Sequence, residues 1–175
     1  NIQTADIDLG SETIVEDIVS PYFEIPKNAS DINLFTDEYN GTNFVNSPQK
    51  ATGVTATIDP ETSTLNVTGF DFNANFVSKT KKEDGSYGKK LIIEFTVRVK
   101  PGFLGGNDVP TNGADSGVYT KDGTSVKKFD VPTVNVPIPD VTVSAEDKNV
   151  YLLGTVTAAD LISGAEVKVG EGNNA

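Results

Sequence analysis

The cleanest alternation of apolar and polar residues in this 175-residue chain runs from Lys89 to Lys100. The apolar side of this stretch consists of Leu91, Ile93, Phe95, Val97 and Val99. A period of two over this length is typical of a half-buried antiparallel strand. Pro101 and Gly102 end it, because proline cannot donate to a strand ladder and glycine frees the turn. We therefore expect residues 89–100 to form a strand whose apolar face lies centrally in the core.

Shorter strands are predicted on both sides of recognisable turns. The predicted hairpins join 54–58 to 65–70 across an Asp-Pro-Glu-Thr-Ser turn, and 117–120 to 125–129 across an Asp-Gly turn. The segment 13–19 is rich in β-branched residues, which favours a strand over a short helix. Residues 133–138 predict a closing edge strand, because Pro132 and Pro137 are tolerated only at a sheet edge.

Many short strands with regular turns and almost no helix predict an all-β fold, an Ig-like antiparallel β-sandwich over residues 1–138. The proline-rich segment 137–140 has the composition of a stiff linker. Residues 139–175 then predict the start of a second small β-rich module, and the whole chain an excised fragment of something longer. Within the second module we expect strands at 141–145, 150–153 and 167–169, and a helix at 157–164, capped by Thr157 and ended by Gly164.

Composition excludes several classes of function. A formal net charge of −11 argues against binding nucleic acid or anionic lipid. The chain has no His and no Cys, which excludes zinc sites of the usual kind, thiol chemistry and Ser-His-Asp relays. No apolar stretch is long enough to span a membrane, and no signal peptide is visible. No cofactor is implied, and we expect a protein that is not an enzyme.

Two sets of polar residues are candidate sites. Asp71, Asn73 and Asn75 have the alternating oxygen spacing that opens a calcium loop, but Phe76 stands where an EF-hand needs glycine. This favours an ordinary polar strand edge, and no metal site is predicted.

The second candidate is an autocatalytic amide cross-link between a lysine amine and an asparagine amide, assisted by a carboxylic acid. The reaction needs a neutral amine and a protonated acid, so the three groups must share an apolar interior. Strand phase nominates Asp71 as the acid and Lys89 and Asn135 as the cross-linked pair. The competing interpretation is that Lys89 extends its ammonium group out of a strand end to solvent, and that Asn135 is an ordinary edge residue.

Three stretches carry a family resemblance: 67–72, 88–95 and above all 101–113, with Gly-Phe-Leu-Gly-Gly-Asn-Asp-Val-Pro-Thr-Asn-Gly. Over roughly residues 10–138 the chain resembles the isopeptide-forming fimbrial or adhesin domains of Gram-positive bacterial surface proteins. The resemblance implies a secreted, cell-wall-anchored stalk or adhesin of tandem Ig-like modules. Its partners would be neighbouring modules and a host or matrix protein or glycan. Such domains usually take the cross-linking lysine from their first strand, whereas the first lysine here is Lys27.

Two other functions are open to a β-sandwich. A carbohydrate-binding module would use exposed aromatic residues, and the clustered ones are Tyr22, Phe23, Tyr39 and Phe44. The absence of Trp and an aromatic content of 8% make this the weaker alternative. A hydrolase with paired carboxylates is a third possibility, but sequence alone cannot set the separation of two carboxylates.

Overall fold

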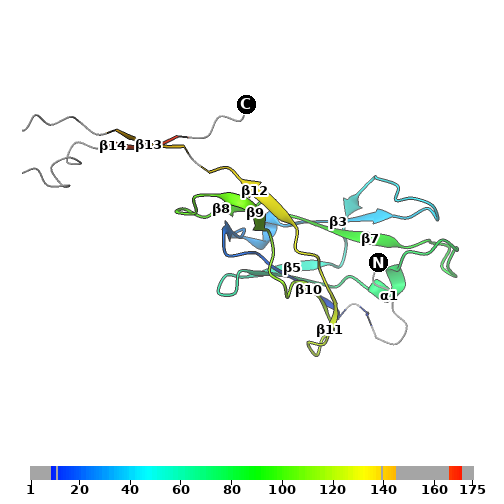
Figure 1. Cartoon of the computed structure of the whole chain (residues 1–175). Coiled ribbons are helices and arrows are strands. Elements are labelled where there is room, and N and C mark those ends of the chain that lie inside the picture. Colours follow the sequence, from blue (N-terminus) through cyan, green and yellow to red (C-terminus); the bar gives the residue numbers. More distant parts are fainter. Residues whose placement is uncertain (1–8, 11, 139, 145–165, 171–175) are drawn as a thin grey trace, which may run out of the picture. The chain divides into compact units, whose positions relative to one another are not determined.

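The computed structural model describes residues 9–10, 12–138, 140–144 and 166–170. The chain divides into two compact units (Figure 1). The first comprises residues 1–103 and 110–133, and the second comprises 104–109 and 134–175. The predicted segments 150–153 and 157–164 lie outside the described residues, and the predicted domain boundary at 138 stays a prediction.

Two antiparallel sheets form the first unit. The larger has the order β11-β10-β1-β6-β5 and the smaller the order β4-β3-β7. Figure 1 shows β3 and β7 in one layer and β5 and β10 in the other. The strands of the larger sheet are β1 (Ile14–Ile18), β5 (Thr55–Asp59), β6 (Thr64–Thr68), β10 (Gly117–Tyr119) and β11 (Ser125–Lys128). Those of the smaller sheet are β3 (Asn33–Glu38), β4 (Gln49–Lys50) and β7 (Lys89–Glu94).

The remaining described elements are short strands and two single helical turns. In the first unit, β2 (Phe23–Glu24) pairs with β8 (Arg98–Val99), and two single turns are the 3-10 helix η1 (Ala29–Asp31) and the helix α1 (Phe72–Asn75). Elsewhere β9 (Gly106–Pro110) pairs with β12 (Thr133–Val136), and β13 (Asp140–Ser144) pairs with β14 (Glu166–Gly170). This arrangement confirms the predicted Ig-like β-sandwich class.

Both predicted hairpins are present, and local hydrogen bonds explain them. In the β5–β6 turn, Oδ1 of Asp59 accepts from the backbone N–H groups of Glu61 and Thr62 at 2.9 and 3.4 Å. In the β10–β11 turn, the Asp122 carboxylate accepts from Thr124 N, and Gly123 has a φ of 86°, which glycine adopts without strain. The sequence therefore specifies these turns with its own side chains.

The core belongs mainly to the larger sheet. Val15, Val67 and Val118 come from the neighbouring strands β1, β6 and β10, and all three are buried. From the facing sheet, Leu34, Leu91 and Ile93 pack against this cluster but are only partly buried. The fully buried members of this cluster therefore come from the larger sheet, whereas the smaller sheet contributes partly buried ones.

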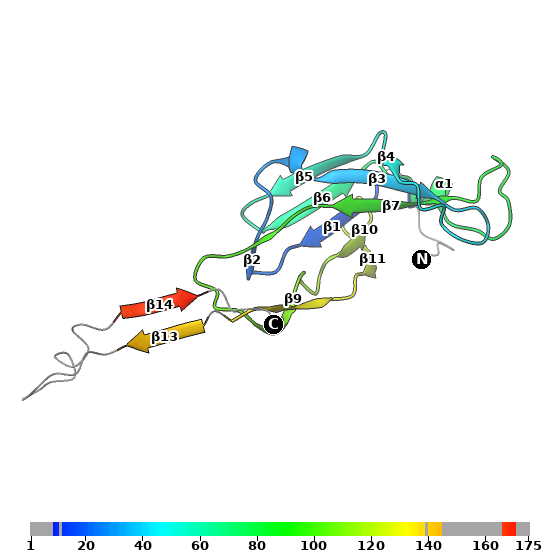
Figure 2. The same cartoon turned by 90° about the horizontal axis from the view of Figure 1, so that it is seen from above.

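The stretch with the cleanest alternation forms two strands rather than one. β7 ends at Glu94 and β8 begins at Arg98. The apolar face of β7 contacts the core as predicted, but the strand lies at the end of its sheet and pairs only with β3 among the described strands (Figure 2). Leu91 and Ile93 therefore pack against the core but are only partly buried, because alternation reports one buried face and not the number of neighbouring strands.

The predicted closing strand at 133–138 is also placed differently. β12 pairs with β9 rather than with either sheet of the first unit. Its partner comes from 103–113, a segment whose glycines predict turns. The amide oxygen of Asn135 accepts from Asp108 N at 3.1 Å, and Asp108 has a φ of 55°. This side-chain bond helps to hold a strand that composition does not favour.

Candidate functional site

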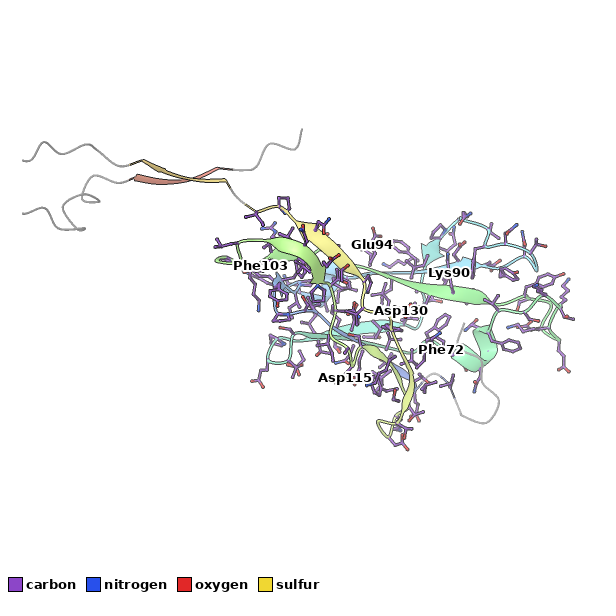
Figure 3. The ribbon with its side chains drawn as sticks, viewed as in Figure 1. Phe72, Lys90, Glu94, Phe103, Asp115 and Asp130 are labelled. Carbon is purple, nitrogen blue, oxygen red and sulfur yellow. The ribbon has the colours of Figure 1, made fainter. Side chains whose placement is uncertain are left out.

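An open cleft of about 850 Å³ lies beside β7 in the first unit. It combines aromatic and aliphatic side chains with lysines. The residues that line it are Val15, Tyr39, Phe44, Phe70, Phe72, Asn75, Phe76, Val77, Ser78, Lys79, Lys89, Lys90, Leu91, Ile93, Val118, Lys127 and Phe129. Figure 3 shows two of them, Lys90 and Phe72, at the α1 end of the sandwich.

The cleft runs along the edge of β7 that pairs with no described strand. Successive side chains of a strand point to opposite faces of its sheet. Lys89, Leu91 and Ile93 share one face and Lys90 lies on the other, yet all four line the same cleft. The far wall includes Lys127 and Phe129, at and just beyond the end of β11, which is itself the outermost strand of the larger sheet. The cleft thus lies where one edge of each sheet pairs with no other strand among those described.

Local structure at α1 shapes one end of the cleft. Oδ1 of Asp71 caps the helix by accepting from Ala74 N at 2.8 Å, and the Asn75 side chain donates to Asp71 O. Phe70 and Phe72 stack edge to face with their ring centres 4.9 Å apart. Gly88 precedes β7 with a φ of 89°, and an added Cβ would lie 2.0 Å from Phe76 O. Only glycine allows the chain to pass this close to the residues after α1.

The cleft carries positive charge, whereas the chain as a whole is negatively charged. Four lysines line it, and none of the described lining residues carries a carboxylate, although the chain has a formal charge of −11. The ammonium of Lys90 lies 4.2 Å from the Phe44 ring centre and 3.7 Å from Oδ2 of Asp37. Within the described part of the chain, Lys79, Lys89 and Lys127 make no ion pair. The site therefore suits a ligand with both apolar groups and negative charge.

Asp37 secures the segment behind the cleft. Its side chain is 1% exposed and accepts from the backbone N–H groups of Asn46 and Ser47 at 3.2 and 3.1 Å. Tyr39 and Phe44 form a backbone bridge, and their rings meet edge to face at 5.3 Å. This buried carboxylate therefore positions the loop that carries Phe44.

Of the three residues predicted for the amide cross-link, Asp71 and Lys89 belong to the first unit and Asn135 to the second. Asp71 caps α1, and Lys89 lies in β7 and lines the cleft. Among the hydrogen bonds and ion pairs of the described residues, none joins Asp71 to Lys89. Asn135 lies in the second unit, exposed, with its amide oxygen bound to Asp108 N. The cross-link stays a prediction.

The other sequence candidates are placed as follows. Asp71 and Asn75, named for a calcium loop, take part in capping α1, and the described residues contain no group of three metal-ligating carboxylates. Of the aromatic candidates, Phe23 is buried and Tyr22 stacks on Phe103 at 4.7 Å. Tyr39 and Phe44 alone of the four line the cleft.

Asp17 is a polar group that sequence reasoning missed. It lies on β1 in phase with buried Val15, and its Oδ1 is buried without a hydrogen-bond partner among the described residues. Burial raises the pKa of its carboxyl above the ordinary value. The alternation of Val15 with Asp17 was the available signal, because it places the carboxyl on the apolar face of the strand.

Fold and strand order define the class of the first unit as an Ig-like β-sandwich. Residues 9–135 match the family described as tip pilin GBS104-like, Ig-like domain, and the chain belongs to that family. Pilin Ig-like domains are structural modules of the Gram-positive cell exterior, of a non-enzymatic type. No curated protein and no solved structure matched the chain. Among the described helices, none is long and apolar enough to cross a membrane.

Proposed function

We propose that this chain is a stalk or adhesive module of a secreted pilus protein anchored to the bacterial cell wall. The observation that carries the proposal is the family match, which extends over residues 9–135 and so includes both sheets of the sandwich. The acidic surface is consistent with this role, because self-repulsion keeps an exposed module soluble. Neighbouring modules of the same protein are its first partners, and a host or matrix protein or glycan is the second.

The surface location is tested on intact cells of the producing bacterium. Antibodies against the purified chain should label the cells, and protease added outside should remove the label. Labelling that appears only after lysis would contradict the proposal.

A replacement experiment separates the stalk role from the adhesive role. Residues 9–135 are exchanged for an unrelated Ig-like sandwich of similar length. A stalk module tolerates the exchange, and both pilus length and adherence are retained. An adhesive module does not, and adherence is lost while pilus length is retained. If deletion of residues 9–135 leaves both pilus length and adherence unchanged, both roles are contradicted.

We further propose that the module forms an internal amide bond between Lys89 and Asn135, with Asp71 as the assisting acid. The Lys89 amine would attack the side-chain carbonyl carbon of Asn135, and the amide nitrogen would leave as ammonia. The support is the family resemblance, together with a Lys89 that has no ion pair among the described residues and that lines a cleft beside aromatic and aliphatic side chains.

Intact mass spectrometry tests the cross-link directly. The folded chain should be lighter than its sequence mass by one ammonia, and Lys89→Arg should restore the full mass. A wild-type chain at its full sequence mass would contradict the proposal for these residues. A deficit that persists in Lys89→Arg would assign the bond to another lysine.

A further inference from the structure

We propose that the cleft beside β7 binds an extended, acidic polypeptide segment, which adds to the smaller sheet as a strand next to β7. The segment would alternate apolar side chains with carboxylates. This inference holds whether the module serves as a stalk or as an adhesin, because it rests only on the geometry and charge of the cleft.

The first support is the free edge of β7. An outermost strand presents a row of unpaired N–H and C=O groups, which form a template for another extended chain. Among the described strands β7 pairs only with β3, through the register from Asn33↔Glu94 to Glu38↔Lys89. Its other edge lies along the cleft, as the lining by residues of both faces indicates. Backbone hydrogen bonds on this edge would provide affinity for any extended chain.

The second support is the composition of the walls. A strand beside β7 would point alternate side chains inward, towards Leu91, Ile93, Val118 and Phe129, and these inner positions suit apolar residues. The core residues of β7 are only partly buried, so an added strand would remove further apolar surface from water. An added strand would therefore contact apolar side chains as well as the backbone groups of the β7 edge.

The third support is the charge of the cleft, which favours an acidic bound segment. Lysines on edge strands commonly discourage pairing between like edges. Here Lys79 and Lys127 lie around the cleft without carboxylate partners among the described residues. Two such basic edges repel each other, whereas a strand with carboxylates is attracted. The same lysines that oppose self-pairing therefore favour an acidic partner.

The test uses the full chain and a fluorescent peptide of alternating valine and glutamate. Binding is followed by anisotropy at low and at physiological salt. We expect saturable binding that weakens with salt, because the lysines are exposed to solvent. A valine–lysine peptide should not bind. A valine–glutamate peptide with alternate backbone nitrogens methylated should bind much more weakly, because it cannot complete a strand ladder.

Charge reversal identifies the site on the protein. Lys79→Glu combined with Lys127→Glu should weaken binding by about tenfold or more. Lys27→Glu combined with Lys50→Glu is the matched control, because these exposed lysines lie outside the cleft and the net charge changes equally. Equal losses in the two variants would overturn the assignment to the cleft. Thermal unfolding of both variants checks that the fold is retained.

Other occupants would give different results, and each would overturn the proposal. Stronger binding of an acidic oligosaccharide, such as a hyaluronan fragment, than of the peptide would identify an acidic glycan site. Equal binding of the methylated and unmethylated peptides would show that no strand is added. Self-association that is blocked by the paired Lys79→Glu and Lys127→Glu changes would identify a second copy of this chain as the occupant.

Discussion

The strands β6 and β7 each carry apolar residues towards the same core, yet their surroundings differ. β6 lies between β1 and β5, and its Leu65 and Val67 are almost completely buried. β7 has β3 on one side and the cleft on the other, and none of its residues is fully buried. The difference shows that a strand's hydrophobic pattern specifies its buried face, whereas its stability and its availability for binding depend on its neighbours.

Truncation of a core side chain in each strand should give the largest contrast. Leu65 is 1% exposed, so Leu65→Ala should lower the free energy of unfolding by about 3–4 kcal/mol through lost burial and a cavity. Ile93→Ala should cost only about 1–2 kcal/mol, because Ile93 lies at the open cleft and water can fill the space. Urea denaturation of both variants measures the difference. Equal costs would mean that β7 is as closely packed as β6.

Loss of the buried carboxylate behind the cleft should have the next largest effect. Asp37→Ala removes the acceptor of two backbone N–H groups and the partner of Lys90, and should cost about 3 kcal/mol. Asp37→Asn is the control, because its amide oxygen keeps one acceptor. The Phe44 loop should also become susceptible to proteolysis in the alanine variant. A fully stable, protease-resistant Asp37→Ala would contradict the assigned role.

The smallest effect should come from the carboxyl group of Asp17, which is partly buried on β1. Because burial raises the folded-state pKa of Asp17, the fold favours its protonated form. The stability that Asp17 contributes is therefore present at low pH and lost as the pH rises through this raised pKa. Asp17→Asn should be more stable than wild type at neutral pH, and the difference should shrink towards about pH 4, the ordinary pKa of Asp. Thermal midpoints across this range measure it, and a difference independent of pH would contradict the burial effect.

The sequence predicted the fold class and both hairpins because those features are local. Period-two alternation marks strands, and Asp59 and Asp122 close their turns with their own carboxylates. The pairing of strands is not local. Nothing in the alternation of 89–100 indicates that β7 has only β3 as its neighbour among the described strands, or that β12 would pair with β9.

The cleft was unpredictable for the same reason. Its walls come from segments far apart in the sequence, including Val15, Tyr39, Phe72, Lys89 and Lys127. Within its own segment, each of these residues is a typical core, aromatic or surface residue and gives no sign of a cleft. The fold brings the lysines together beside β7, which pairs only with β3 among the described strands, and a single sequence does not record which edge is left unpaired.

Residue-resolved amide hydrogen exchange tests the free edge of β7 most directly. All amides of β6 should be protected, because strands lie on both of its sides. In β7, amides that point to β3 should be protected and the alternating ones that point to the cleft should exchange rapidly. The valine–glutamate peptide should then protect these fast amides selectively. Uniform protection of β7 in the free chain would contradict the account of an open edge.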